Sequence, residues 1–212
     1  MARLPYLPAA DAYVIENGGR IFYEDLGRGT AAALQEDTAW RRTHTVAGPA
    51  SQESLAPEER TGALWDAYRK MRERGLACDV AGYSTAVRVS PGGLSEAGMR
   101  GVLSTLPPTL TFSYNLGAAD VIPATSGKER AMRYLAARWG VPPDHSRCVC
   151  MGDDDNDVAM ANACGHCYVP GVNADSMRDA IAARSGRFTV AHRAVFAATE
   201  ECLQAVLDRF SD

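Results

Sequence analysis

The second half of the chain shows the clearest pattern of apolar and polar positions. Between residues 126 and 139, Ala131, Leu135 and Trp139 follow one another at intervals of four, which is the spacing of one helix face. Short apolar runs on both sides of this helix predict strands at residues 120–123, 146–151, 166–170 and 188–190. Three more helices are predicted at residues 155–163, 174–183 and 195–210. Strands that alternate with helices favour an α/β fold with a parallel sheet covered on both faces.

The first half of the chain is more irregular. An apolar run at residues 12–15, the turn-forming sequence Glu16-Asn17-Gly18-Gly19 and an alternating run at residues 20–23 together predict a hairpin or a sharp corner. Further elements are predicted as helices at residues 37–42, 57–75 and 95–106 and as strands at residues 83–89 and 110–116. We therefore expect a core built from residues 1–23 and 119–212, with a separate α/β unit at residues 24–118.

The composition is that of an ordinary globular protein. The chain has 212 residues, of which 46% are hydrophobic and 23% are charged, and its formal net charge is −4. This balance gives no reason to expect nucleic acid or an anionic membrane as a partner. The sequence also has no run of about twenty apolar residues, the length needed to span a bilayer. The six cysteines are not spaced like those of a small disulfide-bonded domain, so we expect a reducing compartment, the cytoplasm.

An acidic cluster follows the strand predicted at residues 146–151. Residues 151–157 read MGDDDND, at the end of a strand, where open α/β sheets bind their ligands. Carboxylates beside a core are costly unless a metal ion, a lysine or water compensates them. Mg²⁺ suits such a set of oxygens, whereas an EF-hand Ca²⁺ loop would need Gly and Glu where Val158 and Cys164 stand. A solvated turn that caps a helix is the alternative.

Lys128 strengthens the interpretation as a site. It opens the helix predicted at residues 126–139, where the helix dipole disfavours a cation. The basic residues of this chain are otherwise nearly all arginine, since the only lysines are Lys70 and Lys128. A compact ammonium group suits a phosphoryl oxygen and a neighbouring carboxylate, and an ordinary surface lysine is the alternative.

Residues 119–163, ADVIPATSGKERAMRYLAARWGVPPDHSRCVCMGDDDNDVAMANA, resemble the last third of the sucrose-phosphate phosphatases. These belong to the haloacid dehalogenase superfamily and carry an α/β cap of the C2 type. AYVIENGGRIFYED at residues 12–25 and CYVPGVNADSM at residues 167–177 are similar to further segments of that family. The resemblance implies a Rossmann-like haloacid dehalogenase core at residues 1–23 and 119–212, and a cap at residues 24–118.

The resemblance also implies a function, that of a Mg²⁺-dependent phosphatase whose substrate is a sugar phosphate, with sucrose 6-phosphate as the first to test. By resemblance, Asp153 would bind Mg²⁺ directly and Asp157 would support the water shell of the metal. Asn156 would help to position the phosphate, and Lys128 would stabilise the phosphoryl group in transfer. Such chemistry depends mainly on positioning and charge neutralisation.

The chain departs from the family pattern in two places. The family has Ser-Gly where this chain has Asp154 and Asp155. The family also begins with a strand that ends in Asp-x-Asp-Gly-Thr, which supplies the nucleophile and the general acid/base, whereas here Asp11 stands alone before Asn17. Without a nucleophile, covalent phosphoryl transfer has no first step, so we expect the chain alone to be inactive.

Three explanations of the missing strand stay open. The chain is a fragment that lacks an N-terminal segment, or a second polypeptide completes it. Alternatively, it is a non-catalytic binding or structural domain, like the phosphatase-like domain joined to sucrose-phosphate synthases.

Four cysteines and a histidine offer a different interpretation, a zinc site. Cys148 and Cys150 lie on a predicted strand, and Cys164, His166 and Cys167 follow it. Free cysteine packs well in apolar cores, so we favour a core role for these residues.

Overall fold

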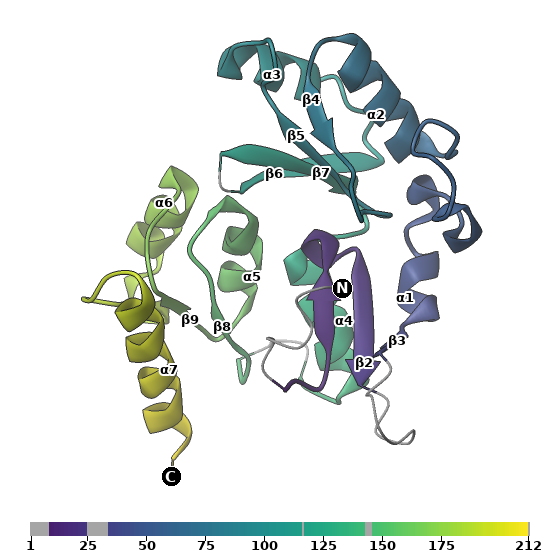
Figure 1. Ribbon diagram of the computed structural model, residues 1–212. Helices are drawn as coiled ribbons and strands as arrows, with labels where there is room; N and C mark the ends of the chain where they lie inside the picture. Colours follow the sequence, from purple (N-terminus) through teal and green to yellow (C-terminus); the bar gives the residue numbers. More distant parts are fainter. Residues whose placement is uncertain (1–8, 25–33, 116, 143–145, 212) are drawn as a thin grey trace.

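The computed structural model describes residues 9–24, 34–115, 117–142 and 146–211, which form a mixed α/β arrangement (Figure 1). The strands are β1 (Tyr13–Ile15), β2 (Arg20–Glu24), β3 (Leu34–Glu36), β4 (Ala77–Asp79), β5 (Val87–Ser90), β6 (Leu110–Asn115), β7 (Ala118–Pro123), β8 (Val149–Met151), β9 (His166–Val169) and β10 (Phe188–Val190). The α-helices are α1 (Thr38–Arg42), α2 (Ala63–Glu73), α3 (Glu96–Leu103), α4 (Lys128–Arg138), α5 (Val158–Ala163), α6 (Asp175–Ala183) and α7 (Phe196–Phe210). Short 3-10 helices are η2 (Glu16–Gly18), η3 (Thr45–Ala47), η4 (Ala50–Gln52), η5 (Asp155–Asp157) and η6 (Ser185–Arg187).

The strands of the described ranges form three sheets. β1, β2 and β3 make an antiparallel sheet, and the predicted hairpin at its start is confirmed by the pairing of Tyr13 with Phe22. β10, β9 and β8 make a parallel sheet. β4, β5, β7 and β6 make an antiparallel sheet, which lies with α2 and α3 above the other two in Figure 1. The predicted α/β class is therefore confirmed.

β7 belongs to the four-stranded sheet, although its sequence suggested a strand of the core. It pairs with β5 on one side and with β6 on the other. All six of its residues are buried, which explains its continuous apolar pattern. β7 leads into α4, and this connection joins the four-stranded sheet to the parallel half of the molecule. The division of the chain at residues 23 and 119 stays a prediction.

α2 begins later than its sequence suggested. The acidic segment at residues 57–59 precedes the helix, whose first residue is Ala63. The intervening loop is held by the buried guanidinium group of Arg60, which donates hydrogen bonds to three backbone carbonyl oxygens, those of Glu53, Leu55 and Tyr83. Gly62 then takes a φ of 115°, a value that favours glycine, and the helix follows. These contacts are tertiary, so the local sequence did not reveal them.

Each sheet packs against its own helices. The largest apolar cluster joins α2 and α3 to the four-stranded sheet, and Trp65 at its centre donates its indole N–H to the carbonyl of Ala47. A second cluster joins α5 and α6 to the parallel sheet around Met177 and Val169. A third joins α4 to β2 through Ile21 and its neighbours. Within the described ranges, the model has no helix of the length and apolarity that a membrane span requires.

The turn between β1 and β2 is anchored by a buried carboxylate. Glu16 and Asn17 both take a positive φ, of 53° and 52°, which is costly for residues other than glycine. The Glu16 carboxylate accepts hydrogen bonds from the backbone N–H groups of Ser84 and Thr85 at 2.9 and 2.6 Å, and from the Thr85 hydroxyl at 2.6 Å. The sequence predicted a strand from residue 83, but β5 begins at Val87, and Ser84 and Thr85 donate their N–H groups to Glu16 instead.

Loss of the Glu16 carboxylate should lower the stability of the protein. Replacing Glu16 by alanine leaves two buried backbone donors without their acceptor, and we expect the free energy of unfolding to fall by about 3 kcal/mol or more. Urea denaturation followed by circular dichroism measures the change. The matched control is Glu73→Ala, at the exposed end of α2, for which the change should stay within about 0.5 kcal/mol. Equal effects of the two substitutions would contradict the assigned role of Glu16.

Candidate active site

The acidic cluster forms a tight turn between β8 and α5. After Met151 the chain passes through Gly152, where a Cβ atom would lie 2.6 Å from the Cβ of Asp157. Glycine is required there because Asp157 folds back over the strand end. The turn then continues as η5, whose residues Asn156 and Asp157 are buried. The sequence thus places a buried carboxylate and a buried amide directly beyond the carboxyl end of a parallel strand.

Lys128 reaches this turn from the first residue of α4. Its ammonium group donates a hydrogen bond to Asp157 Oδ1 at 2.6 Å and another to Asn156 Oδ1 at 3.2 Å. The Lys128 side chain is 32% exposed and that of Asp157 is 7% exposed, so the pair lies at the edge of the solvent. The structure therefore brings together three of the four residues predicted from the sequence.

Asp153, the fourth predicted residue, lies beside them. Its backbone N–H donates to Asp157 Oδ2 at 3.3 Å, and its own Oδ2 accepts a hydrogen bond from Asn173 Nδ2 at 2.7 Å. Burial raises the pKa of Asp153, and the negative charges of Asp157 and Asp154 raise it further. A carboxylate held near other carboxylates in this way is a favourable place for a cation.

The oxygen atoms of Asp153 and Asp157 are the donors that could hold a divalent metal ion. Among the described residues there is no group of three or more His, Cys, Asp or Glu side chains arranged to hold one. Two carboxylates nonetheless fit Mg²⁺, which commonly takes one or two carboxylates and completes its shell with water and substrate phosphate. The chemistry of this donor set suits a hard cation.

The two extra acids of the cluster have structural partners. The Asp154 side chain accepts a hydrogen bond from the backbone N–H of Asp155 at 2.7 Å and caps η5. Asp155 accepts hydrogen bonds from the backbone of Tyr114 and from the hydroxyl of Ser176. Both acids therefore stabilise the turn.

Two cavities open beside Lys128. One, of about 480 Å³, lies between β6 and the start of α4 and includes Ser113, Arg130 and Asn156 in its lining. The other, of about 490 Å³, is an apolar groove between β1, α4 and β8, with Ile15 and Trp139 in its walls. The polar cavity and the apolar groove therefore both border Lys128.

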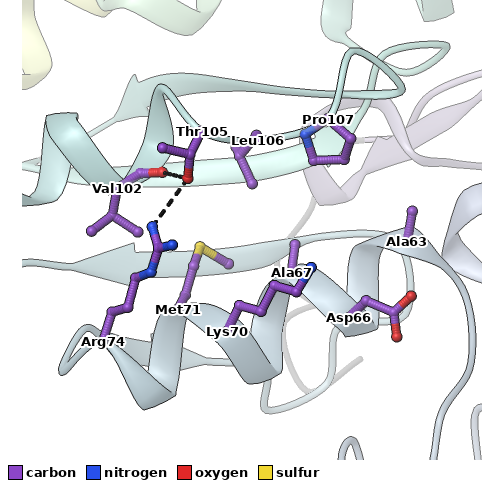
Figure 2. A pocket seen from close by; sticks show the side chains of 10 residues that line it. All are labelled: Ala63, Asp66, Ala67, Lys70, Met71, Arg74, Val102, Thr105, Leu106 and Pro107. Atoms are coloured by element: carbon purple, nitrogen blue, oxygen red, sulfur yellow. Dashed lines mark hydrogen bonds between the residues drawn. The ribbon is translucent and has the colours of Figure 1, made fainter.

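A third cavity lies elsewhere, between α2 and the segment that follows α3. Figure 2 shows Lys70 and Arg74 of α2 on one side and Thr105 and Leu106 on the other, with Arg74 donating to the Thr105 hydroxyl. Lys70 has a carboxylate nearby in this lining, that of Asp66, but no acidic turn comparable to residues 153–157. The two lysines of the chain therefore stand in different surroundings.

Three of the cysteines lie together: the half-buried Cys150 contacts the buried Cys164 and Cys167. The hydrogen bonds that Cys150 makes with Cys164 and Cys167 raise its pKa, and burial raises it further. His166 Nε2 lies 2.8 Å from the Thr189 hydroxyl. Contacts between thiols fit the core role that the sequence favoured for these cysteines.

The sequence did not identify Asn173, Ser176 and Tyr114 as neighbours of the site. Asn173 and Ser176 lie in the segment VNADSM, which carried part of the family resemblance, so that resemblance was the available signal. Tyr114 contributes only its backbone, which no residue pattern can indicate. The contact depends on how β6 lies over η5.

Comparisons with known proteins place this chain in a family. The family model of sucrose-6F-phosphate phosphohydrolase matches residues 103–211, just over half of the chain. A search of curated proteins found no match.

Solved structures show the same fold at low sequence identity. The sucrose-phosphatase of Synechocystis sp. PCC6803, solved with sucrose and phosphate, has a TM-score of 0.70 and 12% identity, over 99% of this chain and 78% of that one. The structure of Thermoplasma acidophilum 0175 has a TM-score of 0.65 and 14% identity, over 99% of this chain and 76% of that one. The haloacid dehalogenase subclass IIB sugar phosphatase BT4131 has a TM-score of 0.56 and 13% identity, over 95% of this chain and 76% of that one.

These likenesses confirm the predicted haloacid dehalogenase type of fold. The family model confirms the resemblance that the segment at residues 119–163 suggested. Because this match spans more than half of the chain, the protein belongs to the sucrose-6F-phosphate phosphohydrolase family.

Proposed function

We propose that this chain carries the metal-binding and lysine side of a Mg²⁺-dependent phosphatase site for a sugar phosphate, with sucrose 6-phosphate as the first substrate to test. The observation that carries the proposal is the ion pair between Lys128 and Asp157, 2.6 Å long, beside the carboxylate of Asp153. Family membership supports the reaction class. The Synechocystis structure, which contains sucrose and phosphate, supports the choice of substrate.

Each residue of the site has a proposed role. Asp153 would bind Mg²⁺ directly, and Asp157 would hold the water shell of the metal while it orients Lys128. The metal, when bound, would neutralise charge on the phosphoryl oxygens. Lys128 would bind a phosphoryl oxygen as a point charge, and Asn156 would fix the direction of the ammonium group through its Oδ1 atom.

We further propose that residues 1–23 and 119–212 act as the core and residues 24–118 as the cap. The polar cavity beside Lys128 lies where β6 of the four-stranded sheet faces α4. A phosphate bound at Lys128 would leave this cavity for the sugar. Arg130 and Ser126 in its lining offer polar groups to hydroxyls, and the buried Ser126 hydroxyl has no hydrogen-bond partner in the described part of the chain.

The apolar groove is the proposed place of the missing strand. Val14 and Ile15 of β1 line this groove and are 39% and 38% exposed, so two large apolar side chains are left uncovered there. β8, on the other wall, is the edge of its parallel sheet and runs toward Asp153. A strand laid parallel to β8 would therefore bring its carboxyl end to Lys128, where a nucleophilic aspartate is needed. It would come from an N-terminal segment or from a second chain.

The proposal predicts separate effects on phosphate and on metal when Lys128 is replaced. Lys128→Met should weaken the binding of inorganic phosphate by about tenfold or more, because a charge-assisted hydrogen bond is lost. Mg²⁺ affinity should not fall, because Asp157 loses a competing cation. Isothermal titration calorimetry measures both, and the control is Lys70→Met on α2. A similar loss in both variants would contradict the role of Lys128.

Asp153 is the proposed direct ligand of Mg²⁺, so its replacement should weaken the binding of the metal. Asp153→Asn removes a charged oxygen and should lower Mg²⁺ affinity by about tenfold. The matched control is Asp175→Asn, because the Asp175 side chain is 92% exposed on α6 and pairs only with Arg178 among the ion pairs of the described residues. Thermal unfolding with and without Mg²⁺ reports the same affinity independently. If Asp153→Asn binds Mg²⁺ like the unaltered chain, the proposed ligand set is wrong.

The proposed place of the missing strand leads to a prediction about the phosphatase activity of the chain alone. The purified 212-residue protein, supplied with Mg²⁺ and sucrose 6-phosphate, should release no phosphate above the uncatalysed rate, because the sequence carries no Asp-x-Asp nucleophile motif before Asn17. Measurable turnover in a phosphate assay would refute this. The intact mass of the protein from its native source then separates two cases: a mass above 22.7 kDa indicates a further segment, and an equal mass indicates a second chain or a non-catalytic domain.

A further inference from the structure

The turn that carries Asn156 and Asp157 is tied to the four-stranded sheet by its first residue, Asp155. Asp155 Oδ2 accepts a hydrogen bond from the backbone N–H of Tyr114 at 3.0 Å, and Oδ1 accepts one from the Ser176 hydroxyl at 2.7 Å. Tyr114 lies in β6 and Ser176 in α6, so one carboxylate joins three segments. Since each oxygen holds a protein donor, Asp155 is engaged in joining these segments.

The bond to Tyr114 closes the edge of a sheet. β6 is the last strand in the order β4-β5-β7-β6, and its only neighbour in the described part of the sheet is β7. Tyr114 stands opposite Ala119 in this pair, and its N–H points away from β7 toward Asp155. An outward N–H on an edge strand needs a partner outside the sheet. Asp155 supplies that partner from the acidic turn.

The residue before Tyr114 is also held. Asn17 Nδ2 donates a hydrogen bond to the Ser113 hydroxyl at 2.9 Å. Asn17 lies in η2, directly after β1, whereas Asp155 lies at the start of η5, separated from the end of β8 by three residues. Two consecutive residues of β6 therefore contact the strand ends of both three-stranded sheets, which are separate sheets in the described ranges. β6 thus helps to fix the distance between them.

β6 also forms a wall of the polar cavity beside Lys128. Thr111, Phe112 and Ser113 line this cavity, with Lys128 and Asn156 also in its lining. A shift of β6 would change the width of the space next to the ammonium group. The contact made by Asp155 is therefore coupled to the size of ligand that fits there.

We propose that Asp155 is a positioning residue that fixes β6 against the acidic turn and thereby sets the width of the cavity beside Lys128. The consequence for substrate size rests on the proposed function, whereas the contact itself does not. The family pattern has glycine at this place, so the pattern does not predict the contact. It arises because this chain supplies a carboxylate where the edge of β6 needs an acceptor.

Hydrogen exchange of single backbone amides, followed by NMR, tests the contact. In Asp155→Ala the Tyr114 amide should exchange about tenfold faster, as expected for the loss of one hydrogen bond to a charged group. Asp155→Asn should restore the protection, because an amide oxygen can accept from Tyr114 while its NH₂ group donates to Ser176. Ser176→Ala should leave the Tyr114 amide protected. Phe112, two residues earlier on the same edge of β6, is the internal reference.

Two outcomes would overturn the proposal. One is an unchanged Tyr114 amide in Asp155→Ala. The other is equal acceleration in Asp155→Ala and Asp155→Asn, which would mean that the charge of Asp155 matters and not its hydrogen bonds. If Asp155→Ala does not fold, the unaltered protein still decides, because a Tyr114 amide that exchanges as fast as that of Phe112 contradicts the contact.

A binding experiment separates this proposal from the proposed function. With Mg²⁺ present, Asp155→Ala should bind sucrose 6-phosphate several-fold more weakly than the unaltered chain, which is the effect expected for the loss of one hydrogen bond. Both proteins should bind inorganic phosphate equally well. Equal binding of both ligands by both proteins would overturn the link to cavity width. If the unaltered chain binds neither ligand, the proposed function fails, while the exchange data still decide the role of Asp155.

Discussion

The ion pair between Lys128 and Asp157 is the interaction around which the other parts of the site are arranged. Asp157 is nearly buried, and a carboxylate in that position depends on a cation or on several donors. Lys128 stands at the start of a helix, where the dipole disfavours a positive charge, so the ammonium group in turn depends on Asp157. β7 leads to one partner and β8 to the other. The ion pair thus joins the start of α4 to the turn that follows β8.

The sheets around this site are not continuous with one another. The described strands form three separate sheets, and side chains make the links between them. Glu16 joins the first hairpin to β5, Asn17 joins it to β6, and Asp155 joins β6 to the acidic turn. Each link uses a polar side chain at a strand end. The apolar groove between β1 and β8 opens next to Lys128.

The sequence predicted those features that depend on local pattern. The helix at residues 126–139 appears as α4, and the strands of the parallel sheet lie close to where their apolar runs suggested. The strands at Leu34–Glu36 and Ala77–Asp79 were not predicted, because three residues give no periodicity and their pairing is decided by distant neighbours. The acidic cluster and Lys128 stood out in the sequence by their chemistry, whereas the role of each residue came from the family resemblance. It could not indicate contacts made by backbone atoms, such as the Tyr114 N–H.

The strained turn at Glu16 and Asn17 has a consequence for the order of folding. Its positive φ values are supported by donors that lie 68 and 69 residues later in the chain. During synthesis, the hairpin therefore emerges from the ribosome long before the groups that hold its turn. Contacts across such separations form slowly, because a long loop must close first. The hairpin is thus made before the groups that hold its turn, and it reaches its final shape only after residues 84 and 85 are in place.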